Sequence, residues 1–251
     1  MELFGLKINF FTSSGLAEGA KVYFYVSGIP VTDTFVSALV MVTIFSLFCI
    51  YLTRNLSLIP GKKQYIAEGF YYAAEYLGEI SLGKAHTKYI YFLGTLFFYV
   101  LFANVVAFLP IPLITYSNGE VVVEPLLRTP TSDLNATISL ALIATFYVIY
   151  SSIASQGIGG YLKSFIDPLP FMLPLNVMGE LTKPLSLSMR LFGNMLSGGI
   201  MMSLVYKYLP IFVPAPLHLY FDIFSGVLQS FIFVMLTAVN ISFGIADEDS
   251  G

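Results

Sequence analysis

The segment KPLSLSMRLFGNM, residues 183–195, decides what kind of fold this chain can adopt. It places a lysine and an arginine in a run of leucine, methionine and phenylalanine, and the surrounding residues, 168–246, are almost uncharged. Their charged side chains are Glu180, Lys183, Arg190, Lys207 and Asp222. A stretch this long and apolar is typical of helices in a lipid bilayer, which need about 20 apolar residues to cross it.

The composition of the whole chain leads to the same fold class. Of 251 residues, 57% are hydrophobic and 11% charged, and the mean hydropathy is +0.80. Soluble domains carry roughly a quarter charged residues, and the net charge is −3. These values exclude a soluble enzyme, a disordered chain and a basic nucleic-acid-binding protein. Cys49 is the only cysteine and the two histidines are far apart, so we expect no disulfide, metal or cofactor. The sequence predicts an all-α integral membrane protein.

Charge-free runs and helix breakers divide the chain into a single membrane domain with about five membrane-crossing helices and one amphipathic surface helix. The glycines at 157, 159 and 160 end one helix, and the prolines at 210, 214 and 216 separate the last two, which are long and tilted. The expected elements are an external N-terminal segment (1–30), helices at 31–54, 88–109 and 134–155, the amphipathic helix at 62–83, and long helices at 174–207 and 216–245.

The distribution of basic residues predicts the orientation. Loops that carry more lysine and arginine stay in the cytoplasm. With five crossings, Lys7, Lys21, Arg128 and Lys207 fall on one side, and the other side holds Arg54, Lys62, Lys63, Lys84, Lys88 and Lys163. The second side is therefore predicted to be cytoplasmic, with the N-terminus outside and the acidic C-terminus, residues 247–249, inside.

Residues 65–83 have two contrasting helical faces. One carries Glu68, Glu75 and Glu79, and the opposite one carries Ile66, Phe70, Ala73 and Leu77. This pattern predicts a helix that lies on the cytoplasmic membrane surface or packs against a neighbouring subunit.

Polar residues form a stripe on each of the last two helices, within about 40° of a reference residue at 100° per residue. On the first helix the reference is Arg190, and the stripe contains Lys183, Ser186, Asn194 and Ser197. On the second the reference is Gln229, and the stripe contains His218, Asp222, Ser225 and Asn240. The two stripes can face each other or a common aqueous cavity.

Each ionisable residue in hydrocarbon costs at least about 2.5–3.5 kcal/mol, so each calls for an explanation. Because Arg190 cannot lose its proton, one interpretation is that it provides a fixed positive charge in an ion path. The alternative is that it forms a structural ion pair with Asp222. Asp222 is correspondingly either a proton relay or the partner in that ion pair. Asn194 and Gln229 are also typical of residues that form hydrogen bonds between helices. The pair Gly198–Gly199 lets another helix approach or clears a channel.

Residues 183–195 closely resemble the signature of subunit a of F-type ATP synthases, of the bacterial type. The run LQSFIFVMLT, residues 228–237, resembles the final helix of that family, and RTPTSDLN, residues 128–135, agrees more weakly. The resemblance extends over about residues 30–245, and the number and order of the predicted helices fit it.

The resemblance implies a non-catalytic stator subunit in the bacterial plasma (inner) membrane, which lies beside a rotating ring of c subunits. Its other implied partners are peripheral-stalk b subunits, other ATP synthase subunits and the lipid bilayer. Two offset half-channels deliver protons to the ring carboxylates and remove them. Arg190 separates the half-channels, Gln229 faces it from the last helix, and Asn194 lies one turn after it.

Two positions depart from the best-known bacterial pattern, which has a glutamate nine residues after the arginine and a histidine seven before the glutamine. Here they are Gly199 and Asp222. We therefore assign Asp222 as the relay of the external half-channel, with Asp133, Asn135 and Asn194 as neighbours. Glu180 is the candidate for the cytoplasmic half-channel, although its offset from Lys183 is not the commonest one.

Three alternatives remain open at the level of sequence. One is the same role with sodium as the coupling ion, which depends chiefly on the ring carboxylate. Another is a self-contained secondary transporter with Arg190 and Asp222 as its substrate site, although the sequence contains no inverted repeat. The last is a membrane scaffold in which the charges form structural pairs.

Overall fold

A computed structural model describes residues 2–3, 6–7, 22–26, 29–54, 57, 61–105, 112–117, 120–125, 129–166, 170–208, 216–217 and 219–246. The α-helices in these residues are α2 (Asp33–Thr53), α3 (Lys62–Leu82), α4 (His86–Val105), α5 (Leu134–Ser164), α6 (Leu173–Tyr208) and α8 (Ser225–Ala246). A π-helical segment, η5 (Leu219–Phe224), leads into α8, and short 3-10 helices occur at η1 (Gly83–Ala85), η3 (Pro130–Ser132) and η4 (Pro170–Met172). The predicted all-α membrane fold is confirmed.

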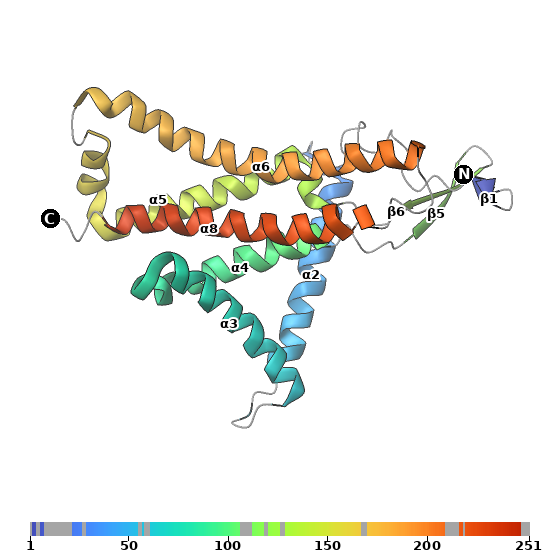
Figure 1. Cartoon of the computed structure of the whole chain (residues 1–251), viewed down its shortest axis with the longest axis horizontal. Coiled ribbons are helices and arrows are strands. Elements are labelled where there is room, and N and C mark those ends of the chain that lie inside the picture. The colour runs from blue at the N-terminus through green and yellow to red at the C-terminus, as the bar shows by residue number, and fades with distance from the viewer. Residues whose placement is uncertain are drawn as a thin grey trace.

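Four of the helices run along the long axis of the molecule: α4, α5, α6 and α8 (Figure 1). Helix α2 crosses this bundle steeply near one end, and α3 slants from the far end of α2 back to the start of α4. Side chains from the four long helices form the hydrophobic core. Fully buried members are Leu93, Val100, Ala141, Leu191, Phe233 and Ile241.

The described residues contain three antiparallel hairpins, which the sequence analysis did not predict. They pair β1 (Glu2–Leu3) with β2 (Leu6–Lys7), β3 (Val22–Val26) with β4 (Ile29–Thr32), and β5 (Pro112–Ser117) with β6 (Glu120–Pro125). The runs VYFYV and EVVVEP are rich in residues that favour strands. Because an analysis based on 20-residue hydropathy cannot register segments of two to six residues, these strands were missed.

Four helices in the described part of the chain are long and apolar enough to cross a membrane: α2, α4, α5 and the continuous helix of η5 and α8. Helix α6 has 36 residues but is not among them, because Arg190, Asn194 and several serines and glycines lower its hydropathy. It packs along α5 and also contacts α8. A crossing by α6 therefore remains a prediction.

The two ends of α5 are explained by local chemistry. Asp133 caps the helix, since its Oδ1 accepts a hydrogen bond from the backbone N–H of Asn135 at 2.9 Å. The expected end of the helix near residue 155 agrees with a break at Gly157, which adopts φ 74° and ψ 166°. Helical structure then resumes and continues to Ser164, which the sequence analysis did not predict. A left-handed φ is accessible to glycine without steric cost, so the chain bends and turns back toward α6.

Several predicted features lie outside the described residues. These are most of the N-terminal segment, residues 106–109 of the helix expected at 88–109, the prolines at 210 and 214, His218 and the acidic residues 247–249.

Helix α3 packs on its own chain, against α4, α8 and α2. Its buried face is centred on Ala74, and Phe70 stacks edge-on against Phe98 of α4 with ring centroids 4.8 Å apart. Of the predicted apolar face, Leu77 is buried and Phe70 half-buried, whereas Ile66 and Ala73 are exposed. The predicted face was therefore correct only along the edge that meets α4.

We expect α3 to lie at the cytoplasmic surface without crossing the bilayer, because Glu68, Glu75 and Glu79 make spanning costly. Cysteines introduced at Tyr72 and Glu79, both exposed, in a Cys49→Ser background should react with an impermeant thiol reagent applied from the cytoplasmic side. A cysteine at Tyr25, which lies in the β3–β4 hairpin, is the control for the opposite side. Reaction of the α3 cysteines from the outside alone would overturn the orientation.

Candidate functional site

The two polar stripes meet where α6 approaches the start of α8. Ser225 Oγ donates a hydrogen bond to Asn194 Oδ1 at 2.7 Å, which joins one residue from each predicted stripe. One turn further along α6, Gly198 is buried, and a Cβ atom there would lie 3.6 Å from the Phe221 side chain of η5. This is an ordinary van der Waals distance, so the contact does not itself require glycine at position 198.

Arg190 lies on the exposed face of α6, while its neighbour Leu191 is fully buried against the bundle. In the part of the chain that the structure describes, the guanidinium forms no ion pair and no hydrogen bond. Ser186 and Ser197 are exposed as well, and Ser197 Oγ donates to the Asn194 carbonyl of its own helix at 3.1 Å. The positive charge is thus directed away from this chain, toward whatever lies against α6.

Gln229 is buried on α8, with 6% of its surface exposed. Its side-chain Nε2 has no hydrogen-bond partner among the described residues, and no hydrogen bond joins it to Arg190 there. A buried donor left without a partner costs about 1–3 kcal/mol. The amide is therefore available to a group that moves or that comes from outside these residues.

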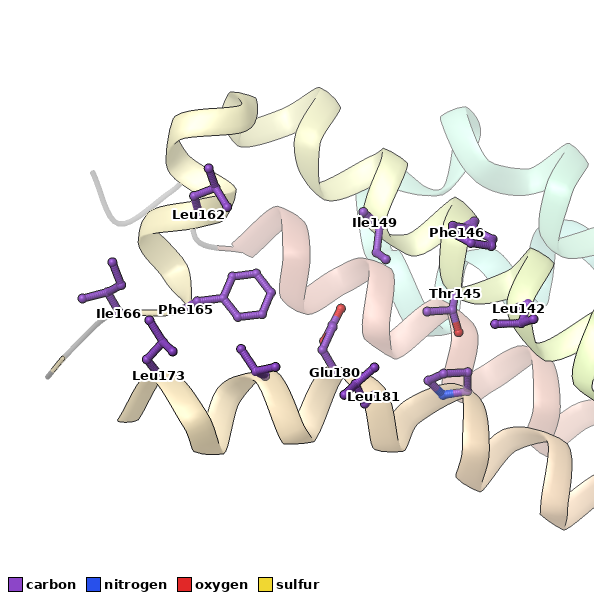
Figure 2. Close-up of a pocket in the computed structure, with 12 residues that line it drawn as sticks. Leu142, Thr145, Phe146, Ile149, Leu162, Phe165, Ile166, Leu173, Glu180 and Leu181 are labelled. Atoms are coloured by element: carbon purple, nitrogen blue, oxygen red, sulfur yellow. The ribbon is translucent and has the colours of Figure 1, made fainter. Parts of the chain in front are cut away.

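Helix α6 diverges from α5 at the end of the bundle where α5 turns back (Figure 1). Two cavities occupy the space between them, and Glu180 lines both. One is an apolar groove of about 750 Å³ between α5 and α6 (Figure 2). The other, of about 330 Å³, is polar and lies between α5, α6 and α8. Its polar lining consists of Ser152, Gln156, Tyr161, Ser164, Asn176, Glu180, Lys183 and Asn240.

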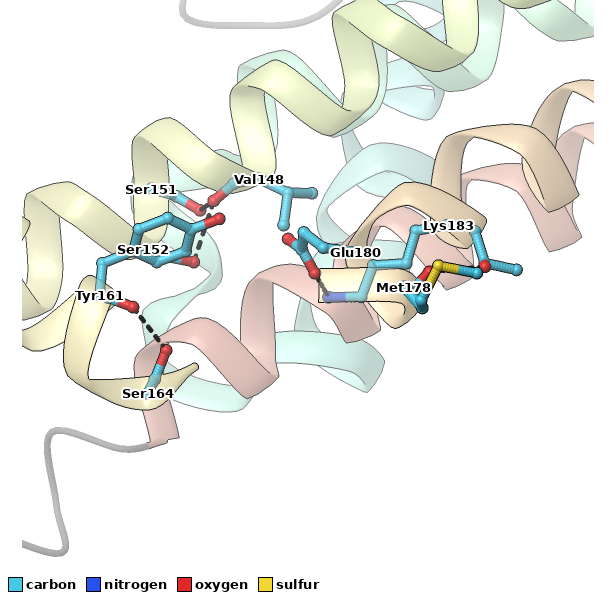
Figure 3. A network of polar contacts seen from close by, with 9 residues as sticks. Val148, Ser151, Ser152, Tyr161, Ser164, Met178, Glu180 and Lys183 are labelled. Carbon is cyan, nitrogen blue, oxygen red and sulfur yellow. Dashed lines mark hydrogen bonds and ion pairs between the residues drawn. The ribbon is translucent and has the colours of Figure 1, made fainter. Parts of the chain in front are cut away.

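An ion pair dominates the polar cavity. Lys183 Nζ lies 2.5 Å from Glu180 Oε2, one turn apart on α6 (Figure 3), and both side chains are only partly exposed. The Tyr161 side chain from α5 lines the same cavity. The sequence analysis singled out Glu180, Lys183 and Asn240 but missed Tyr161, which follows the bend at Gly157, and Gln156, which contacts α8 at Gly244.

Close contact between α5 and α8 closes one wall of this cavity. Gln156 Nε2 donates to the Gly244 carbonyl at 2.7 Å. A Cβ atom at Gly244 would lie 3.0 Å from the Cβ of Ser152 and would collide with its hydroxyl. Glycine at position 244 therefore permits this contact.

We expect Gly244→Ala to separate the end of α8 from α5, because an added methyl group in a tight contact costs about 1–3 kcal/mol. The amount of assembled complex and its midpoint of thermal unfolding should both fall. Gly159→Ala is the matched control, since nothing lies within 4 Å of a Cβ built there. Equal behaviour of the two variants would show that the contact contributes nothing to stability.

Asp133 and Asn135 lie at the junction of α2 and α5, and their proximity to Asp222 remains a prediction. Besides capping α5, Asp133 accepts a hydrogen bond through Oδ2 from Thr34 Oγ1 of α2 at 2.9 Å. Asn135 is exposed. The interactions of Asp133 are therefore those of a residue that positions helices.

Asp222 falls in η5, and its side chain is outside the described residues. The sequence analysis assumed 100° per residue along the whole final helix. Because η5 is a π-helix, with bonds from i to i+5, that spacing does not hold between Asp222 and Gln229. Single π-helical turns are frequent at functional sites.

A buried hydrogen-bond network around Asn104 was not predicted. Asn104 is fully buried on α4; its Oδ1 accepts from Thr131 Oγ1 at 2.9 Å, and its Nδ2 donates to the Gly226 carbonyl at 3.2 Å and to Ser230 Oγ at 3.4 Å. The network joins α4, η3 and α8. A single amide in the apolar run 89–108 was the signal that could have identified it.

Comparison with known proteins gives consistent results. The family model described as ATP synthase A chain matches residues 34–242. The chain is 40% identical to the sodium ion specific ATP synthase subunit a of Propionigenium modestum, over 95% of this chain and 89% of that protein. It is 33% identical to the chloroplastic ATP synthase subunit a of Bigelowiella natans, over 96% and 97% of the two chains. It is 39% identical to that of Oedogonium cardiacum, over 68% and 66%.

Proposed function

Because the chain belongs to the ATP synthase A chain family, and is thus an ion-translocating membrane subunit that works with other ATP synthase subunits, we propose how it moves the ion. Two offset half-channels, one open to each side of the membrane, carry protons to and from the carboxylates of a c ring. Arg190 stands between them. The chain performs no catalysis itself, and peripheral-stalk b subunits hold it still.

The observation that carries the proposal is the position of Arg190 along α6. It is exposed and unpaired among the described residues, with the polar cavity around Lys183 on one side and the Asn194–Ser225 hydrogen bond on the other. Lys183 is seven residues away and Asn194 four, about 10 Å and 6 Å at 1.5 Å per residue. A fixed cation thus separates two polar regions of one apolar helix.

The chemistry of arginine suits this place. A ring carboxylate can lose its proton in an apolar environment only if a counter-charge offsets the loss of hydration. The guanidinium supplies that charge and does not titrate. Each charge that crosses the membrane releases about 2.3 kcal/mol per 100 mV, and an unbroken path would dissipate it. Arg190 therefore attracts the carboxylate and blocks direct leakage.

Glu180 belongs to the cytoplasmic half-channel in this proposal, because it lies in a polar cavity at the end of the bundle assigned to the cytoplasm. Its ion pair with Lys183 orients the carboxylate in that cavity. We place Asp222 and Asn194 in the external half-channel, the N-terminus outside, the C-terminus inside, and the chain in a bacterial plasma membrane.

Replacing Glu180 by glutamine is expected to slow ATP-driven pumping by about tenfold or more, because an amide cannot exchange a proton. Pumping is measured by acidification of inverted vesicles. The double variant Glu180→Gln/Lys183→Gln is the control. If Glu180 only neutralises Lys183, the double variant recovers pumping; if it relays protons, the double variant stays slow.

Sodium is the second candidate for the coupling ion, favoured by the 40% identity to a subunit a that is sodium ion specific. The two ions are distinguished in inverted vesicles with a protonophore. If protons are coupled, the protonophore abolishes ion accumulation. If sodium is coupled, ATP hydrolysis requires sodium, radioactive sodium accumulates, and the protonophore does not abolish its uptake.

A further inference from the structure

We propose that the apolar groove between α5 and α6 binds one acyl chain of an anionic phospholipid, with the headgroup phosphate beside Lys163. Neither Arg190 nor Gln229 lines the groove. Glu180, which we place in the cytoplasmic half-channel, does line it, so the tests below measure bound lipid and not ion pumping. Its walls are apolar side chains from both helices: Leu142, Phe146 and Ile149 from α5, and Leu173, Val177 and Leu181 from α6 (Figure 2).

The lining of the groove favours hydrocarbon over water. Water needs polar partners, and Glu180 and Thr145 are the polar residues of this lining. An empty groove of about 750 Å³ would forfeit the dispersion contacts of all its walls. An acyl chain is apolar and flexible, so it can restore these contacts along the groove.

The charge at one end of the groove identifies the headgroup. Leu162, in the last turn of α5, and Phe165 and Ile166, just after its end, line that end of the groove, which is the one assigned to the cytoplasmic surface (Figure 2). Lys163 lies in the last turn of α5, is exposed, and forms no ion pair with any described side chain. A phosphate there satisfies the cation, while the acidic Glu180 lies further along the groove and is already paired with Lys183.

Filling the groove should release the lipid. Val177 lines the groove, whereas Met178, the next residue on α6, is 61% exposed and does not. The purified ATP synthase complex with Val177→Trp should retain one phospholipid fewer than the wild type by native mass spectrometry, and Met178→Trp should retain the wild-type number. Equal numbers in all three would overturn the proposal.

The headgroup and the nature of the occupant are tested separately. Lys163→Gln should lower the preference for phosphatidylglycerol over phosphatidylcholine about fivefold, whereas Lys88→Gln, an exposed lysine on α4, should not change it. In the assembled complex, a benzophenone amino acid at position 177 should crosslink to lipid on illumination. This result does not depend on whether the Val177→Trp variant folds. Crosslinking to another protein subunit, or an unchanged headgroup preference, would refute a bound anionic lipid.

Discussion

Arg190→Ala is expected to abolish ATP-driven ion pumping in inverted membrane vesicles. Without the guanidinium, a ring carboxylate that passes α6 must be ionised with no counter-charge. An uncompensated charge in the membrane costs about 2.5–3.5 kcal/mol, which corresponds to a loss of about 100-fold or more. Passive ion leakage through the membrane sector should rise at the same time, because the barrier between the half-channels is removed.

Arg190→Lys should also lose most of the pumping, since a lysine in an apolar environment can give up its proton and has no planar fork. Met189→Ala, the adjacent exposed residue of α6, controls for assembly. Near-normal pumping by Arg190→Ala, in membranes that contain the wild-type amount of complex, would eliminate the barrier role and favour a purely structural charge.

Asp222→Asn is expected to give the second-largest effect, a strongly slowed proton flux in a complex that assembles normally. Asp222 lies in η5, seven residues before Gln229 and toward the end of α8 that is assigned to the outside. In the proposed external half-channel, a carboxylate at this position takes a proton from external water and passes it inward, whereas an amide does not titrate. Asp222→Glu should retain part of the flux.

A structural role for Asp222 predicts a different outcome. If Asp222 were required to neutralise Arg190 within the fold, Asp222→Asn would leave a buried charge uncompensated at a cost of about 3–5 kcal/mol. The subunit would then fail to assemble. Assembled complex and pumping are therefore measured in the same membranes, and either loss of assembly or full flux with asparagine would reject the relay.

The sequence by itself determined the membrane class, the helices and their order, because the free energy of burying 20 uncharged residues in hydrocarbon exceeds local preferences. It also singled out the residues whose chemistry is out of place in a membrane, Arg190 and Glu180 among them. The resemblance of residues 183–195 then specified the family to which the comparisons also assign the chain. The sequence analysis did not predict the short hairpins, since hydropathy over 20 residues does not resolve strands of two to six residues.

The tertiary structure decided which of these residues meet. Asn194 contacts Ser225, and Asp133 caps α5 and binds Thr34. A helical wheel gives the direction of a side chain on its own helix; it does not give the distance between helices or a change of helix type such as η5. The polar cavity and the apolar groove arise from the angles at which α5, α6 and α8 pack, which depend on the bend at Gly157 and on the close contact at Gly244, and the Asn104 network depends on the close contact at Gly226.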